Sequence, residues 1–206
     1  MAINKAKVLT VTSVKGGTGK TTTVDDTIAS RLFYDDGHLY FGTGKNSGSG
    51  KYYVIDTKSE KKEDATKTEE IKNVKEIISS EGSFYLKNAV KVGQYIITSD
   101  NQGTISSIDT KNNDKVVSTK EIGKRFSGGI AYDKTTNMIY FVAGTNDLYG
   151  VKVGNDGTFG EEKSVRVYET GYSAMTPEVY NGKVYVMYNE ESRSGKVYLD
   201  EIAGDG

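Results

Sequence analysis

Short apolar runs, each containing a tyrosine, recur along most of the chain. Aligned on that tyrosine, the runs are LYFGTG, QYIITSD, IYFVAGT and VYVMYNE, with Tyr40, Tyr95, Tyr140 and Tyr185 in register at intervals of 55, 45 and 45 residues. Runs of this length, rich in β-branched and aromatic residues and bounded by polar turn residues, are typical of strands. The pattern therefore predicts a β protein built from repeated modules.

The residues around these four repeat tyrosines also recur. A turn precedes the tyrosine, as in YDDGHLY (34–40) and YNGKVY (180–185). Asp-Gly and Asn-Gly tolerate the positive φ angles that a two-residue hairpin requires. A polar loop and a second strand follow, as in KYYVID (51–56) and GTISSID (103–109). Each module reads as strand, turn, strand, loop, strand and turn, and the last module ends at Ile202 without a fourth strand.

These modules resemble those of PQQ-like and related repeat β-propellers, in which a hairpin such as NGKVYV is followed by a strand ending in an L-D or I-D step and a T-K-x-G-K turn. The resemblance is carried by YNGKVYVMY, YVIDTKSEKK and SSIDTKNNDK, at 180–188, 53–62 and 106–115. A repeat of roughly 40 to 50 residues is the length of one four-stranded blade. The resemblance implies an all-β fold with about four antiparallel blades over residues 33–206. This array would be a partial or small propeller, since relatives of this kind usually close with about six to eight blades.

The N-terminal residues 7–24, KVLTVTSVKGGTGKTTTV, resemble the deviant Walker A segment of the ParA/MinD family of ATPases. In such a segment a strand, here Val8 to Val14, leads into a glycine loop whose backbone N–H groups approach phosphate oxygens, and a helix begins near Gly19. The resemblance implies that Lys20 binds the β- and γ-phosphates, that Thr21 binds Mg²⁺, and that Lys15 reaches phosphate across a dimer. The candidate nucleotide-binding residues are Lys15, Gly16, Gly17, Thr18, Gly19, Lys20, Thr21 and Thr22.

The rest of an ATPase site is not recognisable in the sequence. A P-loop ATPase needs a second apolar strand that ends in an aspartate, and helices that cover a parallel sheet. After Val24 the chain continues as DDTIASRLFYDDGH and then as hairpins. The N-terminal strand also has an alternative structural role, because residues 6–14 could pair with the incomplete last module and leave KGGTGKTTT as a connecting loop. The chain therefore divides into a leader (1–24), a connector (25–32) and the repeats (33–206).

The charged segment at residues 58–77, KSEKKEDATKTEEIKNVKEI, lengthens the first repeat interval. We expect a solvated insertion between two blades here, with a short surface helix as the alternative, because Ile71, Val74 and Ile78 share a helical stripe. Acidic turns such as Asp100-Asn101 lack the run of alternating ligands of a calcium loop, so turn chemistry explains them.

Composition restricts the classes of partner. The 206 residues include no cysteine, which excludes disulfides and thiolate metal sites. Lys and Arg total 27 against 28 Asp and Glu, so no long-range field favours nucleic acid. The apolar runs are shorter than the ~20 residues of a membrane-spanning helix. The N-terminus has no stretch of signal-peptide character, which favours the cytoplasm by default, whereas the propellers that the repeats resemble are often exported or surface-attached.

Three functional interpretations follow. The first is a non-enzymatic propeller-like scaffold that binds a protein, a small molecule or a carbohydrate at the propeller face and requires no cofactor. The second is a ParA-like ATPase that uses ATP and Mg²⁺. The third is a fusion in which the P-loop is vestigial. The repeats extend over most of the chain, so the sequence favours the first interpretation over the second, and it does not separate the first from the third.

Overall fold

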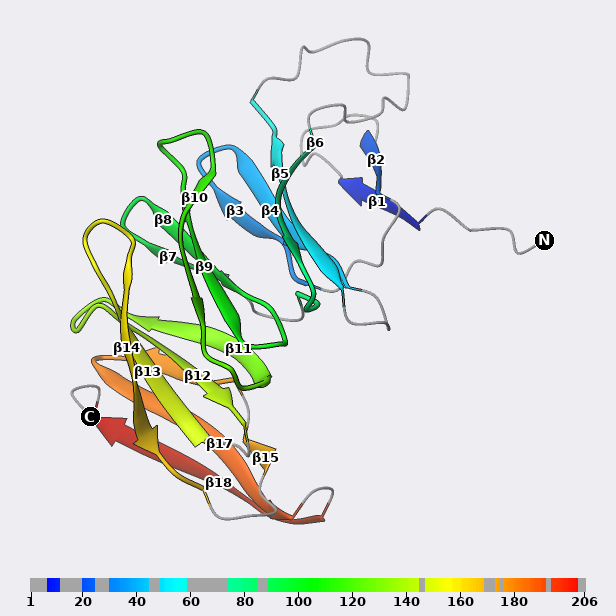
Figure 1. Cartoon of the computed structure of the whole chain (residues 1–206). Coiled ribbons are helices and arrows are strands. Elements are labelled where there is room, and N and C mark those ends of the chain that lie inside the picture. Colours follow the sequence, from blue (N-terminus) through cyan, green and yellow to red (C-terminus); the bar gives the residue numbers. More distant parts are fainter. Residues whose placement is uncertain are drawn as a thin grey trace.

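The computed structural model describes residues 7–11, 20–24, 30–44, 49–58, 74–84, 89–144, 147–168, 173–174, 176–191 and 194–203. Within these ranges every regular element is a strand. The strands form one hairpin and four antiparallel sheets, which follow one another in chain order from the blue to the red end of the ribbon (Figure 1). The prediction of an all-β array of about four antiparallel blades is confirmed. No helix in the described ranges is long and apolar enough to cross a membrane.

The first three sheets have the same topology, with four strands paired in chain order. Sheet 1 contains β3 (Phe33–Asp35), β4 (His38–Gly42), β5 (Gly50–Asp56) and β6 (Val74–Ser80). Sheet 2 contains β7 (Ala89–Val92), β8 (Tyr95–Ser99), β9 (Thr104–Asp109) and β10 (Lys115–Glu121). Sheet 3 contains β11 (Phe126–Asp133), β12 (Met138–Ala143), β13 (Asp147–Val153) and β14 (Phe159–Arg166).

Sheet 4 differs from the others at its outer edge. It contains β15 (Ser173–Ala174), β16 (Glu178–Tyr180), β17 (Lys183–Glu191) and β18 (Ser194–Ala203). The short strands β15 and β16 both pair with one edge of β17, one after the other, while β18 pairs with the opposite edge. Within the described residues the position that β6, β10 and β14 occupy in the other sheets is therefore unfilled, as the end of the repeat at Ile202 predicts.

Two hairpin turns confirm the turn chemistry read from the sequence. Asp36 and Gly37 have φ angles of 40° and 85°, and Asn181 and Gly182 have φ angles of 51° and 73°. Positive φ at both central residues is the property of the type I′ turn, whose twist matches that of the flanking strands. These turns set the register of β3 on β4 and of β16 on β17.

The first three repeat tyrosines lie between neighbouring sheets. Tyr40 packs into the core between sheets 1 and 2, Tyr95 into the core between sheets 2 and 3, and Tyr140 into the core between sheets 3 and 4. The residue after each tyrosine points to the opposite face, so Ile96 contacts the sheet 1 side and Phe141 the sheet 2 side. Burying a side chain of this size is worth about 1.5–3 kcal/mol, so these cores hold the sheets together.

The expectation for the charged segment before residue 80 is wrong at its C-terminal end. Val74–Ser80 is neither a surface helix nor an insertion but β6, which pairs antiparallel with β5 from Ile55↔Val74 to Gly50↔Ser80. The sequence VKEIISS contains three β-branched residues, and pairing with the edge of β5 gives its backbone a hydrogen-bonded ladder that an isolated helix on the surface lacks. Residues 59–73 lie outside the described ranges.

Two structural expectations for the N-terminal segment, the helix near Gly19 and the pairing of the first strand with the last module, are also wrong. Lys7–Val11 (β1) pairs antiparallel with Lys20–Val24 (β2), from Lys7↔Val24 to Val11↔Lys20. Residues 20–24 are thus a strand and not the helix that the P-loop interpretation places near Gly19. The strand β1 also does not complete the last module. Both segments are rich in β-branched Val and Thr, and they are close in sequence, so pairing them costs less loop entropy than pairing β1 with β18.

Candidate functional site

Sheet 4 has one face packed on sheet 3 and one face turned away from it. Side chains alternate across a strand, so Val184 and Val186 of β17 enter the core with sheet 3, while Tyr185 and Met187 point the other way. The register of β17 on β18 places Glu201 opposite Tyr185 and Leu199 opposite Met187. We call this surface the outer face of sheet 4; it comprises Glu178, Tyr180, Lys183, Tyr185, Met187, Val197, Leu199 and Glu201.

The same register position in sheet 3 is a buried contact between sheets. In sheet 3 Val142 of β12 pairs with Leu148 of β13, two residues after the repeat tyrosine, and both side chains are 0% exposed against sheet 4. In sheet 4 the equivalent pair is Met187 and Leu199, which are 50% and 64% exposed. The outer face of sheet 4 therefore has the sequence pattern of a sheet–sheet contact but no sheet against it in the described residues.

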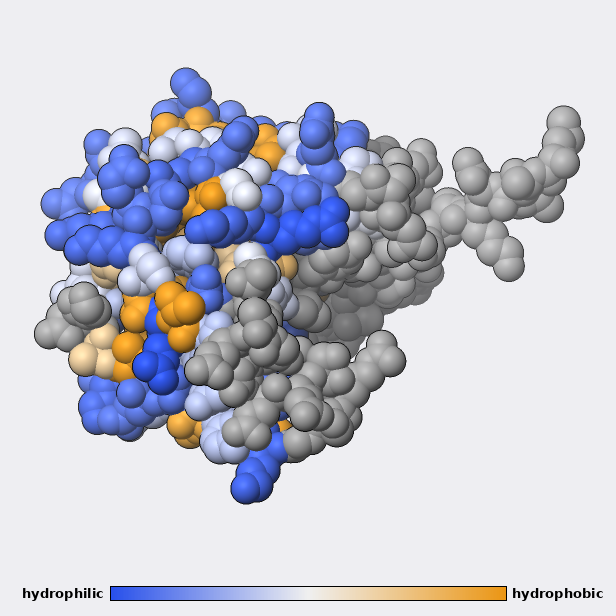
Figure 2. Space-filling model, turned by 60° about the horizontal axis from the view of Figure 1, so that its bottom comes forward, coloured by the Kyte–Doolittle hydropathy of each residue, from blue (hydrophilic) through white to orange (hydrophobic). Residues whose placement is uncertain are grey.

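The apolar area of this face extends beyond the central pair. Val197 on β18 is 71% exposed and Tyr180 on β16 is 68% exposed. Figure 2 turns the bottom of the Figure 1 view, where sheet 4 lies, toward the reader, and it shows apolar residues in orange gathered among hydrophilic ones. Single exposed apolar residues are common on proteins, but a contiguous group of them on one flat face marks an interaction surface.

Lys183 and Glu201 on the outer face neutralise each other, and Glu178, which lies opposite Tyr185, adds a further negative group. Lys183 Nζ forms an ion pair with Glu201 Oε1, and the Tyr185 hydroxyl donates to Glu201 Oε2 at 3.0 Å. The hydrogen bond from Lys183, followed by that from Tyr185, lowers the pKa of Glu201, and the same contacts raise the pKa values of Lys183 and Tyr185. The polar end of the face thus carries one positive and one negative group in contact, next to an uncharged apolar centre.

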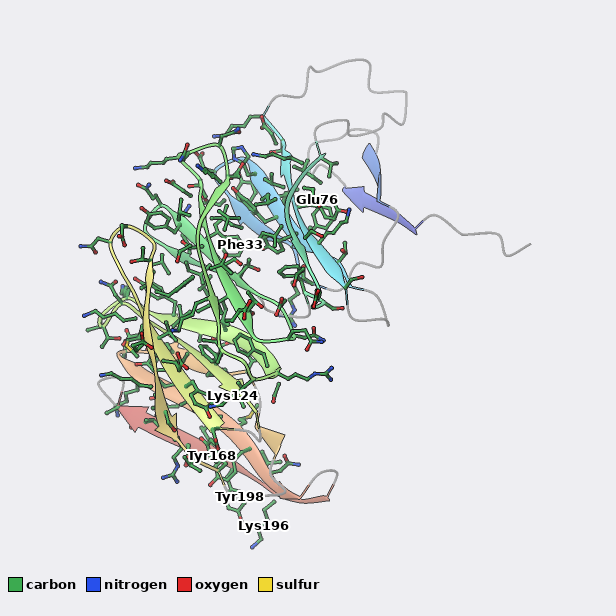
Figure 3. The ribbon with its side chains drawn as sticks, viewed as in Figure 1. Phe33, Glu76, Lys124, Tyr168, Lys196 and Tyr198 are labelled. Carbon is green, nitrogen blue, oxygen red and sulfur yellow. The ribbon has the colours of Figure 1, made fainter. Side chains whose placement is uncertain are left out.

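The opposite face of sheet 4 is firmly attached to sheet 3. Tyr188 packs between Tyr168 and Tyr198, with ring centroids 4.8 Å and 5.3 Å away. Tyr168 and Tyr198 lie near each other at one end of sheets 3 and 4 (Figure 3). Arg166 Nε also lies 3.3 Å from Asp200 Oδ2, which joins β14 to β18. Burial raises the pKa of Tyr168, so its hydroxyl stays protonated. These contacts hold the outer face in a fixed orientation.

Apart from the outer face of sheet 4, the described residues form a hollow between the outer strands β6 and β10. It consists of adjoining cavities of about 590, 290 and 480 Å³, with the apolar residues Ile77 and Val116 in its middle part. Its most buried acidic group, Asp100, is already used: Oδ1 accepts the backbone N–H groups of Gln102 and Thr104 at 2.9 Å each, and Ser80 Oγ donates to Oδ2. This confirms that turn chemistry explains the Asp100 turn.

The residues predicted from the ParA/MinD resemblance are not assembled into a site by the described structure. Lys20, Thr21 and Thr22 lie in β2, opposite β1. Residues 15–19 lie outside the described ranges. A nucleotide-binding role for residues 15–22 stays a prediction.

The outer face of sheet 4 was not predicted from the sequence. The signal for it was present, because Met187 is two residues after the last repeat tyrosine. The sequence alone does not tell which of the two apolar faces of VYVMYNE is covered.

Comparison with known proteins identifies the architecture. No family model matches the chain, and no curated protein matches its sequence. Among solved structures, BamB from Moraxella catarrhalis is 16% identical with a TM-score of 0.51, over 89% of this chain and 53% of that one. The WD40 domain of Toxoplasma gondii coronin is 9% identical with a TM-score of 0.61, over 98% and 55%. The β-propeller domain of Myceliophteria thermophila Cps50 (Swd1) is 11% identical with a TM-score of 0.57, over 98% and 65%.

These similarities show a β-propeller fold. The chain spans about half of the BamB and coronin structures and about two thirds of the Cps50 domain. The described part of the chain is therefore a propeller-like array that corresponds to part of each of these three structures.

Proposed function

We propose that this chain is a non-enzymatic, protein-binding scaffold of the β-propeller type, and that it binds its partner through the outer face of sheet 4. The observation that carries the proposal is the exposure of Met187 and Leu199, at the positions where Val142 and Leu148 are fully buried between sheets. Removing such a pair from water is the main favourable contribution to association. The attachment of sheet 4 to sheet 3 keeps the face preorganised for binding.

The shape and chemistry of the face favour a protein over a small molecule or a carbohydrate. Small-molecule sites are concave and enclose most of the ligand, whereas this face is the surface of a sheet. Protein interfaces combine an apolar centre with a polar rim. Here Met187 and Leu199 form the centre, and the Lys183–Glu201 ion pair lies at the rim.

Affinity capture with matched variants tests this function. The wild-type chain, the double variant Met187→Lys/Leu199→Lys and the control Val167→Lys would each be immobilised and exposed to the same cell extract. Val167 is 68% exposed and lies outside the outer face, so the control adds a charge elsewhere. We expect proteins that the wild type and the control retain to be lost from the double variant. Equal retention by all three chains would refute the assignment of this face.

A further inference from the structure

We propose that the hollow between β6 and β10 is a second binding site, and that it binds an organic cation, an ammonium or guanidinium group on an apolar stem. The site is separate from the outer face of sheet 4 and does not rest on the proposed function. Its two upper parts have volumes of about 590 and 290 Å³ and share part of their lining. These volumes are in the range of small-molecule sites.

The gap between sheets 1 and 2 differs from the gaps between the other sheets. Ion pairs join the outermost described strands of the other neighbouring sheets, Lys120–Glu162 and Arg166–Asp200. No ion pair between described residues joins β6 to β10. Ser80 Oγ of β6 instead donates to Asp100 Oδ2, and Lys75 Nζ donates to the Asn113 carbonyl oxygen. These bonds fix the two ends of the hollow and leave its middle open, so the site is preorganised.

Hydroxyl groups of sheet 2 form one wall of the middle part. Thr119 of β10 lies opposite Ser106 of β9, and both line the cavity. Ser106 is two residues before Ile108, which packs in the core with sheet 1, so Ser106 also faces sheet 1. Ser106 is only 6% exposed, and its hydroxyl has no hydrogen-bond partner among the described residues. Because a buried hydroxyl gains from a partner, this group is available to a ligand that enters the hollow.

Apolar side chains provide the rest of the middle part. Ile77, Ile78 and Phe84 line it from sheet 1, and Val116 lines it from β10. This surface suits the methylene groups of an apolar stem, as on a lysine or arginine side chain. Phe84 is the aromatic residue of this lining, and it is 2% exposed, so it offers a sugar little ring surface for stacking.

The largest part of the hollow is acidic. Its lining includes three carboxylates and, among the described residues, no lysine or arginine: Glu81, Asp100 and Glu121. The lysines nearest to Glu121 in sequence point away, because Lys120 Nζ lies 3.0 Å from Glu162 and Lys124 Nζ donates to the Tyr149 hydroxyl at 2.7 Å. A hollow lined by one sign of charge concentrates the potential and favours a cation.

The third part of the hollow adds no preference for a charge. Its volume is about 480 Å³, and its charged residues are two of each sign, Lys75, Lys115, Glu76 and Asp114. The acidic part alone therefore sets the sign of the ligand, and the apolar middle part beside it sets the need for a stem.

NMR titration of the full ¹⁵N-labelled chain with hexylammonium tests the site, with neutral hexanol as the matched probe. We expect saturable shifts of the backbone amides of Ser106 and Thr119 with hexylammonium, and weaker binding as salt is added. Hexanol should bind roughly tenfold more weakly, because it forms no charge-assisted hydrogen bond. Absence of saturable shifts in β9 and β10, or equal binding of hexanol, would overturn the proposal.

Variants of the lining locate the ligand. Glu81→Gln and Glu121→Gln should each weaken hexylammonium binding by about two- to fivefold, as expected for a partly solvated ion pair. Glu161→Gln removes the same charge from β14, outside the hollow, and should leave the affinity unchanged. Ser106→Val keeps every charge but fills the middle part, so it should abolish binding, with urea unfolding as the check on folding. Unchanged affinity in both glutamate variants would overturn the acidic site.

A peptide identifies the source of the cation. Acetyl-Gly-Leu-Lys-Gly-amide carries the ammonium on a protein side chain, whereas hexylammonium represents a free amine. Tighter binding of the peptide would identify a lysine of a partner protein as the ligand, and tighter binding of hexylammonium would identify a free amine. Either order supports a cation site in the hollow, and binding of neither probe removes it.

Discussion

Truncating the leucine at the same register position in sheets 3 and 4 measures how much stability burial between sheets adds at that position. Leu148 and Leu199 occupy equivalent positions, opposite Val142 and Met187, but Leu148 is fully buried and Leu199 is 64% exposed. We therefore expect Leu148→Ala and Leu199→Ala to differ strongly in their effect on the free energy of unfolding of the monomer.

The magnitudes follow from burial. Leu→Ala in a packed core costs about 3 kcal/mol or more, because transfer energy is lost and a cavity remains. For a chain of this size, about 3 kcal/mol lowers Tm by roughly 6–12 °C. Leu199 has about a third of its side chain removed from water, so its truncation should cost below about 1 kcal/mol, from a full burial value of about 1.5–3 kcal/mol. The expected gap is about 2 kcal/mol.

Urea unfolding gives this gap, provided that it is measured at a protein concentration low enough for the chain to be monomeric. The linear dependence of unfolding free energy on urea gives both differences from the midpoints if the slope is unchanged. Equal costs for the two variants would mean that Leu199 is covered within one chain, and the comparison of registers would fail.

Three further predictions concern the rest of the chain. Gly103 has φ +97°, and a Cβ there would lie 2.1 Å from a backbone carbonyl oxygen, whereas a Cβ at Gly93 would meet nothing within 4 Å. Gly103→Ala should therefore lower the urea midpoint more than Gly93→Ala, and equal effects would show that the loop adapts. Burial raises the pKa values of Tyr40 and Tyr52 above the usual 10.0. Their contribution to the free energy of unfolding is therefore complete below pH 10.0, and above it that free energy should fall by about 1.4 kcal/mol per pH unit for each tyrosine. Urea midpoints that stay constant across pH 10.0 would contradict this. Calorimetric titration with Mg-ATP tests the predicted nucleotide-binding role of residues 15–22. Saturable binding that Lys20→Ala abolishes would establish that role, and no binding by either chain would remove it.

The features of the fold that the sequence predicts are those set by local chemistry. Asn181-Gly182 can form a tight hairpin whatever surrounds it, and the short continuous apolar runs around Tyr140 and Tyr185 are typical of buried strands. The number of sheets follows from counting such units.

The features that the sequence does not predict depend on pairing partners. The strand β6 (Val74–Ser80) follows a charged segment, and only the free edge of β5 explains why it is a strand. Lys20–Val24 matches a phosphate-binding segment in sequence, yet its threonines pair with β1. The candidate site has the same origin, because the apolar character of Leu199 is visible in the sequence whereas its exposure depends on which sheet stands next to it.

The position of sheet 4 at the end of the array has a consequence for motion in the native state. Among the described residues, sheets 2 and 3 each have a core on both faces, while sheet 4 has a core only with sheet 3. Local opening of a segment requires the loss of only its own contacts, so sheet 4 should open at a lower free energy than the sheets before it. Amide hydrogens of β17 should then exchange faster than those of β12, and a protease should cut first near the C-terminal hairpin. Occupation of the outer face should slow both processes there and leave sheet 2 unchanged.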